Sequence, residues 1–193
     1  MTDLIDRQKQ LQQQAFEIVE RLDLINILGK HGQVSLEGSA KYGLMTWRDI
    51  DINLVSETEP SVRVYWDIVK TFFSFAKVKT LTLADNRQQV ENDRPKSMYI
   101  GVKYEDNENN IWKIDIRFLA RKSITPDRIE QLIKDKMTEA SRLSILHIKS
   151  QIWEHPKYHK VFSSKDIYEG VLLAGIKNLD DFKAYLSQKG ISI

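Results

Sequence analysis

Three aspartates have spacings that suit metal-assisted phosphoryl chemistry. Asp49 and Asp51 are two positions apart in residues 49–55, Asp-Ile-Asp-Ile-Asn-Leu-Val, where polar and apolar residues alternate. Because successive side chains of a strand point to opposite faces, both carboxylates project from one face, roughly 7 Å apart at Cα. Asp115 lies in residues 111–119, which alternate in the same way. The sequence therefore predicts two strands that carry carboxylates opposite an apolar face.

If these two strands are neighbours, the three carboxylates meet on the open face of one sheet. Clustered carboxylates repel one another, and divalent cations relieve that repulsion. Oxygen-only ligands favour magnesium or manganese over zinc, and two ions about 3.5–4 Å apart stabilise the attacking and leaving oxygens of phosphoryl or nucleotidyl transfer. A lone Asp-x-Asp pair, or Asp115 alone, would equally suit a solvated strand face. The Asp-x-Asp pair and Asp115 together, each opposite an apolar face, indicate a metal-binding catalytic site.

Gly38 and Ser39 end a short predicted strand, residues 33–39, that runs into a tight turn. A glycine there lets backbone amides approach a phosphate closely, and the serine hydroxyl adds a donor. Taken alone, the pair would suit any turn. Placed shortly before the Asp-x-Asp strand, it favours a phosphate-binding role.

Together these residues resemble the DNA polymerase beta-like nucleotidyltransferase superfamily. The pattern of that family is an apolar residue, Gly-Ser, a spacer, Asp-x-Asp on a strand, and a third carboxylate on a later strand. It reads here as Leu36-Glu37-Gly38-Ser39, nine intervening residues, Asp49-Ile50-Asp51-Ile52, and Ile114-Asp115-Ile116. The resemblance covers about residues 30–120. Glu37 departs from the apolar residue or glycine often found there.

The resemblance implies a role for each residue of the pattern. Asp49 and Asp51 would bind the Mg²⁺ or Mn²⁺ ions that carry a nucleoside triphosphate such as ATP. Asp115 would complete the catalytic site and act as general base, and Gly38 with Ser39 would hold the β- and γ-phosphates. The implied reaction transfers a nucleoside monophosphate to an acceptor hydroxyl or phosphate and releases pyrophosphate.

The acceptor is less well defined than the reaction. Residues 46–51, Thr-Trp-Arg-Asp-Ile-Asp, also look like the corresponding stretch of lincosamide and aminoglycoside nucleotidyltransferases. We expect a small-molecule acceptor, because the net charge is only +2 and no RNA-binding module is recognisable. A protein side chain or an RNA 3′ end is the alternative within this chemistry. Outside it, the alternative is a non-catalytic nucleotide-binding regulator or a toxin–antitoxin component.

Three further side chains are candidates for nucleotide binding. Arg117 shares the face of Asp115, and either neutralises a triphosphate or pairs with Asp115. Tyr99 either stacks on a base or is an ordinary half-buried tyrosine, and Lys41 is expected to reach a phosphate. Lys113 is expected to be a solvated strand residue. Three basic residues in the polar segment 84–96 border the acceptor or are simply solvated: Arg87, Arg94 and Lys96.

The remaining pattern predicts an α+β fold: a mixed sheet with flanking helices and a helical C-terminal part. Strands are expected over 33–39, 49–55, 97–104 and 111–119. Helices are expected from a cap at Thr2 to the region of Gly29 and Gly32, and over 61–78, 125–154, 165–174 and 180–188. We divide the chain into a catalytic domain, residues 1–122, and a helical extension, residues 123–193.

Composition limits the class of protein further. The chain has no cysteine, which excludes disulfides, thiolate zinc sites and cysteine nucleophiles. Its N-terminus does not resemble a signal peptide, and no apolar stretch approaches the ~20 residues of a membrane-spanning helix. We expect a soluble cytoplasmic protein without membrane contact. The sequence does not define its oligomeric state.

Overall fold

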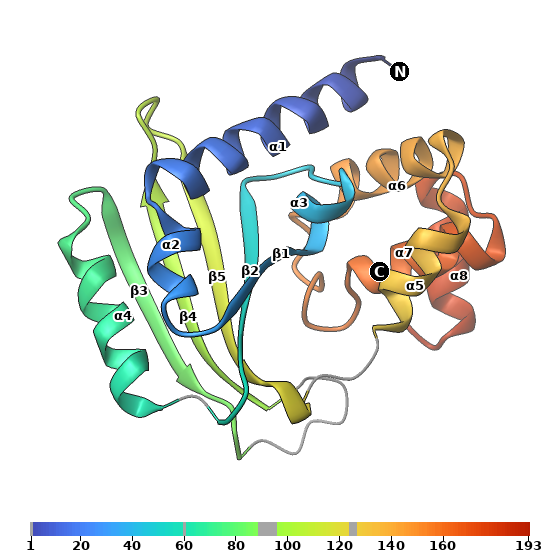
Figure 1. The fold of residues 1–193 in the computed structure, drawn as a ribbon. Coiled ribbons are helices and arrows are strands. Elements are labelled where there is room, and N and C mark those ends of the chain that lie inside the picture. The colour runs from blue at the N-terminus through green and yellow to red at the C-terminus, as the bar shows by residue number, and fades with distance from the viewer. Residues whose placement is uncertain (1, 60, 89–95, 124–126) are drawn as a thin grey trace. The chain divides into compact units, whose positions relative to one another are not determined.

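A computed structural model describes residues 2–59, 61–88, 96–123 and 127–193. They form a mixed five-stranded sheet with flanking helices and a set of C-terminal helices, so the predicted α+β fold is confirmed (Figure 1). The strands are β1 (Gln33–Glu37), β2 (Asp49–Ser56), β3 (Val78–Asp85), β4 (Ser97–Glu105) and β5 (Ile111–Ala120). The helices are α1 (Thr2–Arg21), α2 (Leu24–Gly29), α3 (Gly38–Tyr42), α4 (Val62–Ser74), α5 (Arg128–Lys136), α6 (Glu139–Ile152), α7 (Ser164–Ala174) and α8 (Leu179–Gln188), with a 3₁₀ turn at Arg121–Ser123.

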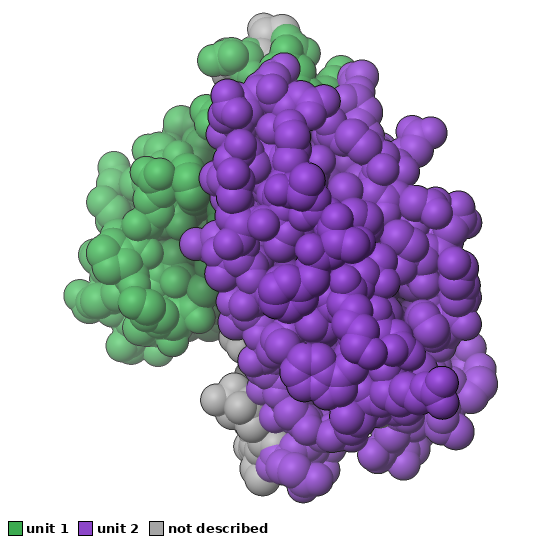
Figure 2. Space-filling model, turned by 90° about the vertical axis from the view of Figure 1, so that its left-hand side faces the viewer, with its two compact units in different colours: residues 1–11, 43–47, 126–193 green, residues 12–42, 48–125 purple. Residues whose placement is uncertain are grey.

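The chain groups into two compact units (Figure 2). The sheet unit consists of residues 12–42 and 48–125, and holds all five strands with α2, α3, α4 and the second half of α1. The helical unit consists of residues 1–11, 43–47 and 126–193, and holds the first half of α1 with α5 to α8. Residues 43–47 of the helical unit thus lie in the chain between two segments of the sheet unit.

The sheet has the strand order β1-β2-β5-β4-β3, and β2 and β5 pair in parallel while the other pairs are antiparallel. Alternation fixes one face of its two central strands as core, because Ile52 and Ile116 are fully buried. Helix α4 packs on this face: the ring of Tyr65 lies 5.3 Å from that of Phe118, and Phe72 is fully buried. Figure 1 shows α2 along the same side as α4. The opposite face is therefore left for polar side chains.

The hairpin between β4 and β5 is held by one buried carboxylate. Asp106 accepts hydrogen bonds from the backbone amides of Glu108 and Asn110, both at 2.9 Å, and from the indole nitrogen of Trp112 at 3.0 Å. Because buried polar groups are costly unless they are paired, these bonds fix the turn and its register. The register matters for function, since it determines which residues of β4 lie beside Asp115.

Four elements differ from the sequence prediction. Gly38 and Ser39, which were expected to end a strand in a tight turn, begin the short helix α3 instead. The first helix breaks at Asp23, whose φ of 52° is left-handed, a conformation that Asp tolerates better than most residues. The predicted helix over 125–154 is two helices, because Thr138 caps α6 through a capping box with Ser141. Strand β3 was not predicted, although Leu81 and Leu83 alternate with threonines: this short pattern lies between the expected helix 61–78 and the polar segment 84–96.

In the helical unit, α7 packs against α5, α6 and α8. Ser163 caps α7, and Asp127 caps α5 through the amides of Ile129 and Glu130. The Thr125-Pro126 part of the predicted helix start lies outside the described residues. Among the helices of the described ranges, none is both long and apolar enough to cross a membrane.

Candidate active site

The three predicted carboxylates lie on one face of the sheet unit. Strands β2 and β5 are neighbours, as the prediction required, and Asp51 is the direct Cα partner of Asp115. Adjacent strands are about 4.8 Å apart, so these two carboxylates start from nearly adjacent backbone positions. Asp49 precedes Asp51 by two residues and shares its face. Asp49 and Asp115 are buried, and Asp51 is partly exposed.

Lys113 lies between two of these carboxylates. Its Nζ is 2.5 Å from Oδ2 of Asp115 and 3.6 Å from Oδ1 of Asp49. Burial lowers the pKa of Lys113, but the charges of Asp49 and Asp115 and the bond to Asp115 outweigh it and raise the pKa above its ordinary value. The ammonium therefore stays charged at neutral pH. The expectation that Lys113 is a solvated strand residue is wrong, and its Cα pairing with Asp49 is the reason.

Arg117 forms an ion pair with Asp51. Its Nη2 lies 3.4 Å from Oδ1 of Asp51, so Arg117 pairs with Asp51 and not with Asp115. The alternation of the strand predicted the face of Arg117 correctly. The ion-pair partner of Arg117 depends instead on the parallel register, in which Arg117 is opposite Asn53. Asn53 was not predicted as a site residue, and its Oδ1 is buried without a hydrogen-bond partner among the described residues.

Tyr99 reaches the site from β4. Its hydroxyl donates a hydrogen bond to Oδ1 of Asp115 at 2.8 Å. Gly101, the direct partner of Asp115, lies beneath it: a Cβ at position 101 would overlap the Tyr99 hydroxyl. Burial, and then the charge of Asp115, raises the pKa of Tyr99 above its ordinary value, so the hydroxyl remains a donor. Gly101 was missed by the sequence analysis, because its role depends on strand register.

Gly38, the first residue of α3, lies against Asp51. Gly38 has a φ of 61°, a region that favours glycine, and a Cβ there would overlap the Asp51 carboxylate. Ser39 is buried. The glycine thus allows the start of α3 to approach the carboxylate that is proposed to carry metal. We find no bulkier residue compatible with this geometry, which makes the spacing between Gly38 and Asp51 a structural requirement.

Glu37 adds a fourth carboxylate to this end of the sheet. It is the Cα partner of Asp51 in β1, so both side chains share a face. Its oxygens accept from the hydroxyl of Ser35 at 2.6 Å and from Lys41 at 3.0 Å. Lys41, a predicted phosphate ligand, is therefore paired with Glu37. The sequence analysis gave Glu37 no role, because only the β1–β2 register places it opposite Asp51.

Of the other basic candidates, Arg87 is paired with a carboxylate at the end of β3. Arg87 donates two side-chain hydrogen bonds to Asp85, at 2.8 and 2.6 Å. Lys96 is exposed, and Arg94 lies outside the described residues. An acceptor-binding role for this segment stays a prediction.

The donor set can be compared with what a magnesium ion requires. Asp49, Asp51 and Asp115 offer only oxygen ligands from one face, which is the chemistry that magnesium prefers. In the side-chain arrangement of the described residues, no three acidic or histidine side chains are gathered into a metal-binding group. Lys113 and Arg117 neutralise the carboxylates instead. The carboxylates suit a magnesium ion in their oxygen ligands and in the position of their backbone. The side chains of Lys113 and Arg117 would have to move before an ion could bind.

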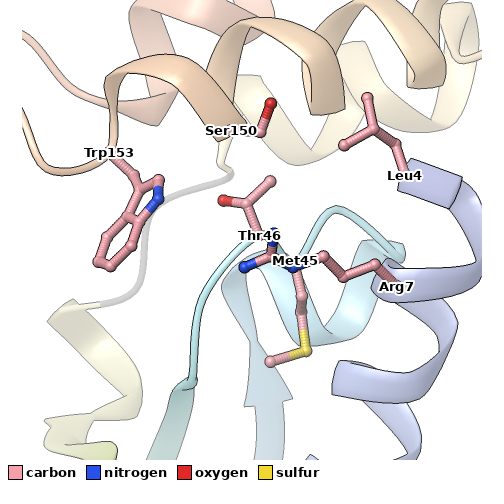
Figure 3. Close-up of a pocket in the computed structure, with 6 residues that line it drawn as sticks. All are labelled: Leu4, Arg7, Met45, Thr46, Ser150 and Trp153. Atoms are coloured by element: carbon pink, nitrogen blue, oxygen red, sulfur yellow. The ribbon is translucent and has the colours of Figure 1, made fainter.

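The helical unit contains a small cavity of about 10 Å³, lined by residues of α1, α6 and the segment before β2 (Figure 3). Its lining residues are Leu4, Arg7, Met45, Thr46, Ser150 and Trp153. This volume holds about one water molecule, so the cavity is not a nucleotide site.

This chain has the fold seen in solved structures of Cid1 poly(U) polymerase. No family model and no curated protein matches it, so the comparison is one of structures. Cid1 poly(U) polymerase with MgGTP bound matches with a TM-score of 0.60 and 14% identity, over 84% of this chain and 49% of that chain. A mutant of Cid1 bound to MgATP matches with a TM-score of 0.51 and 14% identity, over 89% and 50%.

A GTP pyrophosphokinase family protein from Streptococcus pneumoniae matches over 92% of this chain and 95% of that chain, at 12% identity. Its TM-score of 0.42 is too low to bear on the reaction. The chain spans about half the length of the Cid1 structures. Likeness at such identities establishes the fold and leaves the activity to be argued from the site.

Proposed function

We propose that this protein is a metal-dependent nucleotidyltransferase, which moves a nucleoside monophosphate from a nucleoside triphosphate to an acceptor hydroxyl or phosphate. The observation that carries the proposal is the pairing of Asp51 with Asp115 on adjacent parallel strands, with Asp49 on the same face and Gly38 against Asp51. Isolated surface carboxylates have no need of neighbours placed so closely, whereas metal-assisted transfer requires them.

The proposed step is an in-line displacement. An acceptor oxygen attacks the α-phosphorus, the bond from that phosphorus to the oxygen bridging to the β-phosphate breaks, and pyrophosphate leaves with the bond electrons. Asp115 takes the proton of an acceptor hydroxyl, which is the role of a general base. Bound magnesium or manganese would supply Lewis-acid stabilisation of the phosphate oxygens. Asp49 and Asp51 would hold the ions, with Asp115 completing the set.

The surrounding residues are assigned to binding and positioning. Gly38 and Ser39 would present backbone and hydroxyl donors to the β- and γ-phosphates, and Lys41 would supply charge beside them once it leaves Glu37. Arg117 would neutralise triphosphate charge in place of its pairing with Asp51. We assign Tyr99 to positioning Asp115, because its hydroxyl is engaged there; stacking on the base is the alternative.

For the acceptor we retain a small molecule as the first candidate. An RNA 3′ end is the second, because the polymerase Cid1 shares this fold at a TM-score of 0.60. A nucleotide-binding regulator without turnover is the alternative outside catalysis. The retention of three carboxylates on one face counts against it, since binding alone does not require a positioned base.

The test is transfer of label from α-labelled triphosphates, each supplied with Mg²⁺ or Mn²⁺ and either a metabolite extract or an oligoribonucleotide. The parent should label one acceptor class and release pyrophosphate, and Asp51→Asn should not. Asp180→Asn is the matched control, because its side chain is 95% exposed in the helical unit. Metal-dependent triphosphate binding without transfer would favour the regulator, and absence of both would refute the proposal.

A further inference from the structure

One lysine occupies the position of a cation in the acidic cluster. The Lys113 ammonium bridges Asp49 and Asp115, as a metal ion between two carboxylates would. The carboxylate side chains are 11% and 8% exposed, whereas that of Lys113 is 41% exposed. The acids are thus held in a largely desolvated position, and the lysine has an open path to solvent.

We infer that Lys113 and a divalent cation are alternative counterions for Asp49 and Asp115, so that metal binding expels the Lys113 ammonium. This inference rests on the proposed function, because that function requires a bound divalent metal ion. A magnesium ion requires ligand oxygens at about 2.0–2.1 Å, and the ammonium now hydrogen-bonds Oδ2 of Asp115. An ion bound to that oxygen would lie close to the ammonium, and their mutual repulsion favours displacement of the lysine, whose side chain is the more exposed partner.

The exchange makes metal binding depend on nucleotide. Without a ligand, Lys113 offsets the repulsion between the carboxylates and lowers their affinity for a free ion. A bound triphosphate supplies new negative charge for the expelled ammonium, so the cost of expulsion falls. Metal and nucleotide should therefore strengthen each other's binding, and linkage makes this effect reciprocal. Removing the lysine charge should raise the affinity for metal alone and weaken the coupling.

The test measures Mn²⁺ binding to nucleotide-free protein by electron paramagnetic resonance and calorimetry. Lys113→Met, which keeps the length of the side chain and removes its charge, should bind Mn²⁺ about tenfold more tightly than the parent, the size expected for a hydrogen bond between charged groups. Without metal it should melt at a lower temperature, because Asp49 and Asp115 lose their counterion, and Mg²⁺ should restore the loss. Lys103→Met is the matched control: Lys103 is exposed, and it is the Cα partner of Lys113.

If Lys113→Met does not fold, a second variant and a measurement on the parent protein still test the exchange. Lys113→Gln should behave in the same direction, since it too removes the charge. In the parent, reductive ¹³C-methylation of lysines should give a Lys113 signal, assigned by its loss in Lys113→Arg, that shifts when Mg²⁺ and triphosphate are added.

Tight metal binding that is equal in the parent, Lys113→Met and Lys113→Gln would overturn the exchange and leave the metal site intact. An unmoved Lys113 signal at saturating metal would overturn it as well. Absence of metal binding in all variants, with or without triphosphate, would overturn the metal site of the proposed function and the exchange with it.

Discussion

The hydroxyl of Tyr99 donates a hydrogen bond to Oδ1 of Asp115 across 2.8 Å, and the absence of a side chain at Gly101 makes the contact possible. Tyr99 and Gly101 are two residues apart on β4 and share one face of the sheet, on which Gly101 is the direct partner of Asp115 and Tyr99 that of Arg117. The arrangement orients one oxygen of Asp115 while Lys113 contacts the other. The Tyr99 contact thus fixes the orientation of Asp115, which the role of base requires.

We predict that Tyr99→Phe lowers turnover about tenfold, because a hydrogen bond to a charged group contributes about 1.5–3 kcal/mol. Gly101→Ala should have the same effect, since the new methyl group displaces the Tyr99 hydroxyl. The double variant should be no worse than either single one, because both remove the same contact. Single-turnover rates of the three variants provide the measurement, and additive losses would contradict a shared mechanism.

Asp115→Asn should separate catalysis from binding. Loss of a positioned general base costs about 10²–10⁴-fold in rate, and loss of a metal ligand adds to this. The affinity for metal–triphosphate should change less, because Asp49 and Asp51 remain. The melting temperature should fall only modestly, since Asn keeps the shape and an acceptor for Tyr99 but removes the charge that pairs with the partly exposed Lys113.

The assays for Asp115→Asn are acceptor labelling, calorimetry of nucleotide binding and thermal melting of the same preparation. Where no acceptor is known, slow triphosphate hydrolysis serves instead. Unchanged turnover in this variant would place Asp115 outside the catalytic site and leave a two-carboxylate nucleotide site.

Much of the site could be predicted because strand alternation is a local property. The period of two in residues 49–55 and 111–119 assigns Asp49, Asp51 and Asp115 to polar faces without knowledge of the partner strand. Register is not local. Which residue faces Asp51 or Asp115 depends on the pairing of β1, β2, β5 and β4, so Glu37 and Gly101 could not be recognised.

The secondary structure also shows that local features could be predicted from the sequence and non-local ones could not. Caps such as Ser163 are read from short sequences, and the helix that Ser163 begins was predicted within one residue of its observed start. The alternating pattern of strand β3 covers only residues 80–83, and as an edge strand it contacts one neighbour and is largely exposed. The break at Thr138 depends on a capping box that competes with a continuous helical pattern. Tertiary context decides both.

Asp106 should give the fold an acid-sensitive turn. Burial raises its pKa, but hydrogen bonds from Asn110, Trp112 and the amide of Glu108 outweigh burial and lower the pKa below the ordinary 3.8. A group with a depressed folded pKa stabilises the fold above its unfolded pKa. That stabilisation is complete well above pH 3.8 and is lost as the pH falls through this value toward the folded pKa.

Asp106→Asn should therefore cost about 1–3 kcal/mol of unfolding free energy at neutral pH, because buried donors lose a charged acceptor. The cost should shrink below pH 3.8, where the parent carboxylate becomes protonated. Urea unfolding of parent and variant at several pH values measures both effects. Glu108→Gln, in the same turn but exposed, is the control. A cost that is independent of pH would show that Asp106 acts through packing alone.

Gly38→Ala tests whether the start of α3 must approach Asp51. Two effects add in this variant: the left-handed φ of 61° costs an alanine about 1–2 kcal/mol, and the methyl group overlaps the Asp51 carboxylate. Gly190→Ala isolates the first effect, because Gly190 has a φ of 79° and nothing within 4 Å of an added Cβ. The excess loss in Gly38→Ala therefore measures the contact with Asp51.

We expect Gly38→Ala to lower both the melting temperature and the affinity for metal–triphosphate more than Gly190→Ala does. Ser39→Ala should weaken nucleotide binding less, because it deletes one hydrogen bond worth about 0.5–1.5 kcal/mol. Thermal melting and calorimetry of the three variants decide the order. If Gly38→Ala and Gly190→Ala lose equal stability and both bind nucleotide like the parent, the glycine serves only the backbone at the start of α3. The phosphate-binding role of Gly38 would then have to be abandoned, because a methyl group that displaces Asp51 cannot leave a metal–triphosphate site unchanged.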